Sequence, residues 1–243
     1  IALLALFLAP TTHGARPQVS AASKTLLDAA NRDRAADHLP ALQWDSALAA
    51  AAHQHALRMA KANTLSHRFP GEPAMQDRAR QAGARFSLIA ENVAQGPSVA
   101  GLHTQLMKSP PHRANLLDPQ LNSVGISVVQ TRNVYFAVEN FSAAVPRLTL
   151  DAQEQEVASQ LATHGLRSVN STADARKTCA LDRGWAGQKP AGVLRYETGD
   201  LTRLPDDIAL KLDSCRYHSA AVGACDARGS GDFTRFRVAI LLF

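Results

Sequence analysis

Apolar positions at helical spacing predict two helices at the start of the chain. The first is expected over residues 20–38 and is ended by Pro40, because a proline disfavours helical backbone in the residue before it. The second is expected over residues 46–62 after Asp45, whose carboxylate suits a helix N-cap. Its apolar stripe consists of Leu48, Ala52, His55, Ala56 and Met59. His55 on this stripe is therefore predicted to be a buried histidine with satisfied hydrogen bonds.

Turn-forming residues interrupt the helical pattern over residues 64–90. Prolines and a glycine in this stretch leave room for one short helix, at residues 75–81. Further helices are expected at residues 99–108 and 112–117, on either side of a Ser-Pro-Pro sequence.

Strand-like runs then replace the helical pattern. Residues 124–129 and 134–138 are rich in Val, Ile, Phe and Tyr, and a Thr-Arg-Asn turn separates them. This arrangement predicts a β-hairpin. Helices followed by a hairpin make the first 145 residues an α+β module.

A second segment begins at Pro146. It opens with a predicted helix at residues 151–164, followed by a polar, turn-rich stretch at 167–190. The remaining expected elements are strands at 192–196, 215–222 and 233–243 and a helix at 205–212. The last strand ends in a wholly apolar run, as a strand buried on both faces does. We expect residues 146–243 to form a smaller α/β extension, to which the sequence assigns no role.

Composition and charge narrow the functional classes. The chain is 46% apolar and 19% charged, which excludes an intrinsically disordered protein. Its net charge of +5 is spread without basic blocks or interleaved aromatic residues, so nucleic acid is not expected as a partner. The sequence contains no Gly-x-Ser-x-Gly elbow, Walker loop or GxGxxG motif, which removes support for α/β-hydrolase, nucleoside triphosphatase and dinucleotide-binding functions.

The first residues indicate export. Ile1 to Pro10 are almost wholly apolar, and small residues follow them up to Ala15. This pattern predicts that residues 1–15 are a truncated signal peptide, with cleavage after Ala15. The run is shorter than the roughly 20 residues of a transmembrane helix. The expected location is therefore secreted, either extracellular or periplasmic, with no transmembrane segment in the mature chain.

Three cysteines lie in the last third of the chain, at positions 179, 215 and 225. In an exported protein we expect one disulfide and one remaining thiol. The spacing does not choose among the three pairings, although Cys215 and Cys225 could join neighbouring strands. There is no CxxC pair, so a thiolate zinc site is not expected.

Two histidines and a glutamate are the candidate chemistry-bearing residues. His67, Glu91 and His112 are each expected in a loop or at the edge of an element. Together they could bind zinc and leave a position for water, or they could form a hydrogen-bonded cluster that fixes loops around a pocket. Their spacing is not that of a metal motif and favours neither reading. Ser109, beside His112, could imitate a nucleophile–base pair, but a serine before two prolines more simply ends a helix.

Several ordered segments resemble the CAP superfamily, also called SCP/TAPS, which includes cysteine-rich secretory proteins, antigen 5 and plant pathogenesis-related 1 proteins. The segments are LLDAANRDRA at 26–35, LQWDSAL at 42–48, LSH at 65–67, AENVA at 90–94, LMKSPPHRANLL at 106–117, LNSVGISVV at 121–129 and VYFAVENF at 134–141. Their order and spacing are similar to the bacterial branch, and they cover about residues 21–142. The resemblance implies a CAP domain over residues 20–145, with an α-β-α sandwich around a central antiparallel sheet.

The resemblance also implies a cleft lined by histidines and acidic residues, which in some members takes a divalent metal, often zinc. His67, Glu91 and His112 match the first cleft histidine, the glutamate of the family's GEN motif and the second histidine. Ser109 fits the serine of the bacterial pattern, and Asn92 is expected to have a scaffold role beside the cleft. The chain departs from the family where Leu106 replaces a tryptophan, Ala90 replaces a glycine and the second glutamate of eukaryotic members is absent.

Two functions follow from these residues. The first is a secreted, non-catalytic binding module, whose His/Glu cleft takes a lipid, another cell-envelope ligand or a divalent cation. The alternative is a zinc-dependent hydrolase or protease, with His67 and His112 as metal ligands and Glu91 as the general base. A third possibility is that residues 146–243 carry the binding function of an envelope protein.

Overall fold

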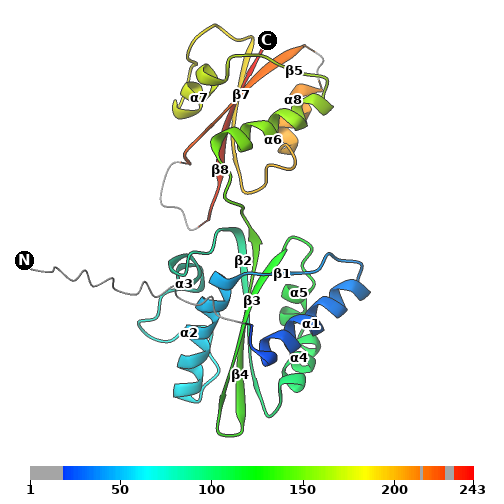
Figure 1. The fold of residues 1–243 in the computed structure, drawn as a ribbon, viewed down its shortest axis with the longest axis vertical. Helices are drawn as coiled ribbons and strands as arrows, with labels where there is room; N and C mark the ends of the chain where they lie inside the picture. Colours follow the sequence, from blue (N-terminus) through cyan, green and yellow to red (C-terminus); the bar gives the residue numbers. More distant parts are fainter. Residues whose placement is uncertain (1–18, 214–215, 228–232) are drawn as a thin grey trace, which may run out of the picture.

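Two four-stranded sheets organise the chain, each between helices of its own half (Figure 1). The computed structural model describes residues 19–213, 216–227 and 233–243. The predicted signal peptide at residues 1–15 therefore lies outside the described residues, as does Cys215. Within the described ranges, no helix has the length and apolar character needed to cross a bilayer.

The first half contains five helices and four strands among its described residues. In chain order they are α1 (Ala21–Ala36), β1 (Gln43–Trp44), α2 (Ser46–Ala62), α3 (Met75–Gln81), β2 (Phe86–Gly96), α4 (Val99–Lys108), α5 (Pro110–Leu116), β3 (Ser123–Thr131) and β4 (Val134–Ala144). The strand order is β1-β3-β4-β2; β1 runs parallel to β3, and the other pairs are antiparallel. The helices predicted from the sequence and the β3–β4 hairpin are confirmed.

Local sequence explains the helix starts and the layering. The Asp45 carboxylate accepts hydrogen bonds from the backbone N–H groups of Ala47 and Leu48, which caps α2 as predicted. The apolar stripe of α2 packs on one face of the sheet, while α1, α4 and α5 cover the other face. The first half is therefore an α-β-α sandwich.

One expectation was wrong in this half. Residues 86–96 form strand β2, where the sequence analysis placed the end of a loop, so Glu91 lies in the middle of a strand. The polar pair Glu91 and Asn92 breaks the apolar pattern of this strand. Both are nevertheless buried, because each is hydrogen-bonded on its own face of the sheet.

A buried arginine fixes the loops around α5. Arg34 of α1 donates hydrogen bonds to the backbone carbonyls of Pro40, Leu116, Asp118 and Leu121. Burial lowers its pKa, although Asp118 opposes that change. This side chain ties the end of α5, and with it the segment that carries His112, to α1.

The second half has a similar layered arrangement. Its elements are α6 (Leu150–Thr163), β5 (Arg167–Ser168), α7 (Thr172–Ala180), β6 (Gly192–Thr198), α8 (Asp206–Leu212), β7 (Ser219–Cys225) and β8 (Phe236–Leu242). The turn-rich stretch predicted at 167–190 in fact contains β5 and α7. Strand β7 begins at Ser219, four residues later than the position expected for it. Helices α6 and α8 pack on one face of this sheet and α7 on the other.

A disulfide joins Cys179 of α7 to Cys225 of β7. This pairing settles which of the three alternatives occurs, and it is not the Cys215–Cys225 pair that adjacent strands would have allowed. The two halves meet where Phe86 accepts a backbone hydrogen bond from Thr234 (2.7 Å) and packs edge-to-face against Phe233.

Candidate functional site

Strand β2 presents successive side chains to opposite faces of the first sheet. Glu91 pairs with Asn140 and points toward α2 and α3, whereas Asn92 pairs with Glu139 and points toward α1 and α5. Because β2 is the edge strand, loops from both helical layers reach it. The candidate residues therefore gather around this edge, on both faces of the sheet.

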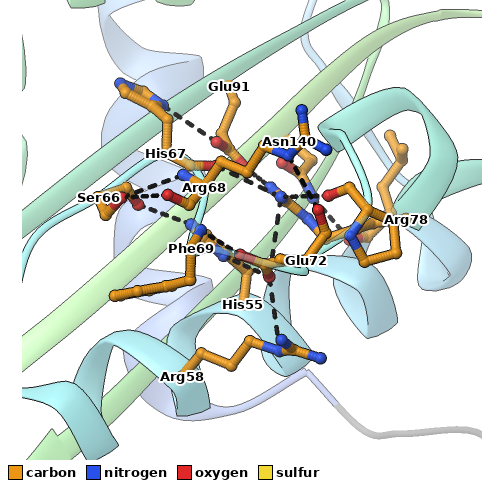
Figure 2. Close-up of polar contacts among 12 residues, drawn as sticks. His55, Arg58, Ser66, His67, Arg68, Phe69, Glu72, Arg78, Glu91 and Asn140 are labelled. Atoms are coloured by element: carbon orange, nitrogen blue, oxygen red, sulfur yellow. Dashed lines mark hydrogen bonds and ion pairs between the residues drawn. The ribbon is translucent and has the colours of Figure 1, made fainter.

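The carboxylate of Glu91 is the centre of the first cluster (Figure 2). Its Oε1 atom accepts a hydrogen bond from Nδ1 of His67 (3.0 Å), and its Oε2 atom accepts one from Nη2 of Arg78 (2.5 Å). The side-chain amide of Asn140, oriented with its nitrogen toward Glu91, donates to Oε2 (3.1 Å). The side chain of Glu91 is 4% exposed, whereas that of His67 is 59% exposed. The carboxylate is thus enclosed, and the imidazole that it holds faces solvent.

A second buried carboxylate fixes the loop that carries His67. Glu72 accepts hydrogen bonds from Nδ1 of His55 (2.8 Å) and from the backbone N–H of Phe69 (3.0 Å), and Arg78 lies 3.8 Å away. Burial alone would raise the pKa of Glu72, but these donors and charges lower it overall. The loop between α2 and α3 is therefore held to both helices by charge-assisted contacts.

His55 is a fully buried, satisfied histidine, as the sequence predicted. Nδ1 faces the Glu72 carboxylate and Nε2 faces the backbone carbonyl of Ser66 (2.7 Å). Both ring nitrogens therefore have a hydrogen-bond partner inside the protein. Next to this histidine, Glu72, Arg78 and Glu91 form a chain of alternating negative and positive groups.

On the other face, Asn92 connects His112 to the sheet. Its Nδ2 atom donates to the backbone carbonyl of His112 (3.1 Å) and to Oε2 of Glu139 (3.3 Å), and its Oδ1 atom accepts from Asn115 (2.9 Å). This arrangement fits the scaffold role expected for Asn92. Ser109 stands at the junction of α4 and α5, where it precedes α5 without a side-chain capping bond.

The two histidines differ in their electrostatic surroundings. The hydrogen bond to Glu91 raises the pKa of His67 above 6.5, although burial and the Arg78 charge oppose it. Burial lowers the pKa of His112, and the positive charge of His67 lowers it further. His112 is therefore neutral near pH 7. Since the Glu91 carboxylate is an acceptor, neutral His67 keeps its proton on Nδ1 and has a lone pair on the exposed Nε2.

These groups suit a divalent cation only in a limited way. A histidine that donates Nδ1–H to a carboxylate is the usual arrangement for a metal ligand that coordinates through Nε2. His67 fits this description, and His112 could supply a second imidazole. Among the described residues, however, no group of three or more His, Cys, Asp or Glu side chains could hold a metal ion. The candidates therefore offer a cation two imidazoles at most, because both oxygens of the Glu91 carboxylate already accept hydrogen bonds.

Three residues that the sequence did not predict hold the candidate side chains in position. Arg78 and Asn140 bind Glu91, and Glu139 is fully buried beside Asn92. Burial raises the pKa of Glu139 to about 7, despite the Asn92 hydrogen bond. Glu139 and Asn140 interrupt the apolar run of β4, and that interruption was the available signal. Nothing comparable marked Arg78, which resembles any other arginine of a short polar helix.

Comparisons with known proteins agree with the geometry of the first half. The sequence model of the cysteine-rich secretory protein family, or CAP, matches residues 27–141. The uncharacterized protein YkwD of Bacillus subtilis (strain 168) is 27% identical over 126 residues, which are 51% of this chain and 49% of that protein. The chain thus spans about half the length of this curated relative.

Two solved structures are each similar to about half of the chain. An extracellular protein from Bacillus anthracis that contains an SCP domain is 31% identical, with a TM-score of 0.45 over 49% of this chain and 39% of that chain. An outer surface protein from Borrelia burgdorferi is 21% identical, with a TM-score of 0.49 over 53% of this chain and 96% of that chain.

Proposed function

Because residues 27–141 form a CAP domain of the bacterial type, we propose that the chain is a secreted binding module rather than a hydrolase. Its ligand-binding site lies along the edge strand β2, where the exposed imidazole of His67 comes from one face of the sheet and His112 from the other, close enough for the charge of His67 to act on His112. The ligand is a lipid or another component of the cell envelope, which a divalent cation would bridge to the two imidazoles. Secretion is supported by the apolar N-terminal sequence and by the extracellular relative from Bacillus anthracis.

One observation carries the preference for binding over catalysis. A general base must reach the proton that it removes, directly or through one water molecule. Both oxygens of Glu91 are already occupied, by His67 on one side and by Arg78 and Asn140 on the other. The carboxylate is buried and neutralised by Arg78, so it supports His67 in position and does not activate water. In this role Glu91 is a positioning residue.

A zinc ion, where bound, would be held by His67 and His112, and it would supply a Lewis acid that can coordinate a carboxylate or phosphate of the ligand. The residues of the chain orient the imidazoles: Glu91 sets the proton of His67, and Asn92 holds the backbone of His112. Two imidazoles provide fewer ligands than most structural or catalytic zinc sites, so we expect weak, reversible binding.

The experiment is a zinc titration by calorimetry on the full chain, together with assays of peptide and ester hydrolysis in the presence of zinc. We expect one weak site that is lost in His67→Ala/His112→Ala and retained in His53→Ala, an exposed histidine on α2. We also expect no hydrolysis. A turnover that requires zinc and disappears in Glu91→Gln would instead establish the hydrolase.

The ligand is sought in the same preparations. Organic extraction and mass spectrometry of the purified wild type should yield a lipid that is depleted in the His67→Ala/His112→Ala variant. If the extracts of the two proteins match, and added fatty acids bind neither, the His67 face does not bind lipid.

A further inference from the structure

The second sheet repeats the strand order and directions of the first. The orders are β1-β3-β4-β2 and β5-β7-β8-β6. In each sheet a two-residue first strand runs parallel to the third strand, and the remaining pairs are antiparallel. Each strand of the second sheet has the same place in chain order as its counterpart, so the two halves share one topology (Figure 1).

The helices repeat as well. A helix precedes the two-residue strand and packs on one face, as α1 and α6 do. The next helix, α2 or α7, packs on the opposite face, and a short helix, α5 or α8, lies between the second and third strands. Among the described residues of the second half there are no counterparts of α3 and α4.

The same close contact joins sheet and helix in both halves. A Cβ atom on Gly125 of β3 would lie 2.0 Å from the backbone nitrogen of Ala49 in α2. A Cβ atom on Gly223 of β7 would lie 2.1 Å from the backbone carbon of Ala175 in α7. At each place only glycine lets the helix approach the strand so closely.

These glycines provide a reference for comparing the two sites. Gly125 pairs with Asn140, which pairs with Glu91; Gly223 pairs with Ala239, which pairs with Arg195. Arg195 therefore stands where the first half has Glu91. It donates to the backbone carbonyls of Thr178 (3.1 Å) and Gly184 (2.5 Å), and so anchors the loop that follows α7. Glu91 likewise anchors the loop that follows α2, through His67.

We infer that residues 146–243 are a second, diverged copy of the CAP fold, in which the loop at residues 181–191 replaces the His67 loop and docks onto an anionic lipid surface. In this copy a rigid loop with an exposed tryptophan and two cations stands in place of the loop that carries His67. This inference is independent of the ligand proposed for His67.

Several contacts hold this loop in one conformation. The Cys179–Cys225 disulfide fixes the end of α7, and the hydroxyl of Thr178 accepts the backbone N–H of Ala186 (2.9 Å). Gly187 has φ +76° and lies against the carboxylate of Asp174, where a Cβ atom would fall 1.9 Å from Oδ2. A loop that is ordered before binding loses little conformational entropy on docking.

The loop presents the chemistry of a membrane-interface anchor. Trp185 is 44% exposed and Leu181 is 40% exposed, and the side chains of Arg183 and Lys189 are exposed on the same loop, whose one acid, Asp182, lies 3.9 Å from Arg237. Tryptophan favours the headgroup region of a bilayer, and Lys and Arg are attracted to anionic lipids. The net charge of +5 adds long-range attraction to such a surface.

The test uses the full chain with vesicles of phosphatidylcholine and phosphatidylglycerol, and with vesicles of phosphatidylcholine alone. We expect co-sedimentation with the anionic vesicles, weakening at high salt, and a blue shift of tryptophan emission that is absent in Trp185→Ala. At about 1 kcal/mol per cation, Arg183→Ala/Lys189→Ala should lower the partition coefficient by roughly 25-fold.

Matched control variants test whether reduced vesicle binding comes from the loop or from any loss of charge or apolar surface. Leu210→Ala removes a leucine on α8 that is 73% exposed, and Lys24→Ala/Arg203→Ala removes two exposed cations outside the loop. These variants should bind like the wild type, and circular dichroism should show that every variant is folded. The inference is overturned if anionic vesicles do not bind the wild type, or if the loop variants bind as well as the controls. Vesicle binding by the wild type without an emission change, or binding by Trp185→Ala that is as strong as that of the wild type, would point to charge alone and would also overturn it.

Discussion

Replacing Arg78 with methionine should destabilise the first half by about 3–5 kcal/mol, because removing one member of a buried ion pair leaves its partner uncompensated. The side chains of Arg78 and Glu91 are 6% and 4% exposed, and Nη2 lies 2.5 Å from Oε2. At an effective dielectric constant of about 20, unit charges 4 Å apart attract by about 4 kcal/mol, which is the same order. Methionine keeps most of the aliphatic volume, so little of the loss comes from a cavity.

The same substitution should loosen the His67 loop. Arg78 also donates to the backbone carbonyls of His67 (3.3 Å) and Pro73 (3.2 Å). Without these bonds we expect faster amide hydrogen exchange over residues 64–74 than in the wild type. The His67 imidazole would also lose its fixed orientation, and zinc affinity should fall.

A double-mutant cycle separates the ion pair from the other contacts of Arg78. The variants are Arg78→Met, Glu91→Gln and both together, each followed by urea unfolding. We expect the double variant to recover much of the loss, because neither charge then remains buried without a partner. Arg80→Met is the control, since Arg80 pairs with Asp77 at an exposed position, where such pairs contribute at most about 1 kcal/mol. Additive effects, or an Arg78→Met cost no larger than that of Arg80→Met, would refute the reasoning.

Three further predictions concern titration and packing. In metal-free buffer the raised pKa of His67 stabilises the folded state below pH 6.5, and this stabilisation is lost as the pH rises through the folded-state pKa. An NMR titration should give His67 a lower pKa in Glu91→Gln than in the wild type. An unchanged pKa would contradict this account. Burial raises the pKa of Glu139 from 4.5 to about 7, so stability falls as pH rises between these values. In Glu139→Gln the free energy of unfolding, measured with urea, should therefore be about 3 kcal/mol higher than in the wild type near pH 8 and almost unchanged near pH 4. An equal increase at both pH values would argue against a raised pKa of Glu139. Gly125→Ala and Gly223→Ala should each lower the free energy of unfolding by about 3 kcal/mol or more, because the new Cβ atom would overlap with helix backbone. Hydrogen exchange should show each loss of stability in the half that carries the substitution. A mild effect of either substitution would mean that the helix can move away.

Local signals were enough to predict most elements of the first half. The Asp45 cap, the stripe of α2 and the β3–β4 hairpin depend on residues that are close in sequence, and the structure contains all three. Strand β2 was missed because its centre is Glu91 and Asn92. Those side chains are buried only through partners on α3, α5 and β4, which are distant in sequence.

The candidate site also combines features that the local sequence predicts with features that depend on distant residues. His67, Glu91 and His112 could be named from sequence, because their residue types and order resemble a family pattern. The role of Glu91 could not, since it depends on Arg78 and Asn140, whose own sequence contexts are ordinary. In the second half, β5 and α7 lie among polar and turn-forming residues. Local propensity favours these two elements only weakly, and they are stabilised by the disulfide, by Arg195 and by the close contact at Gly223.

The separate apolar cores of the two halves have a calorimetric consequence. The cluster around Val157, Ile208 and Ile240 is distinct from the clusters of the first half, so melting one core leaves the other largely packed. A thermogram should then contain two endotherms, and one melting temperature would describe neither. A reducing agent should shift only the endotherm of the half that contains Cys179 and Cys225.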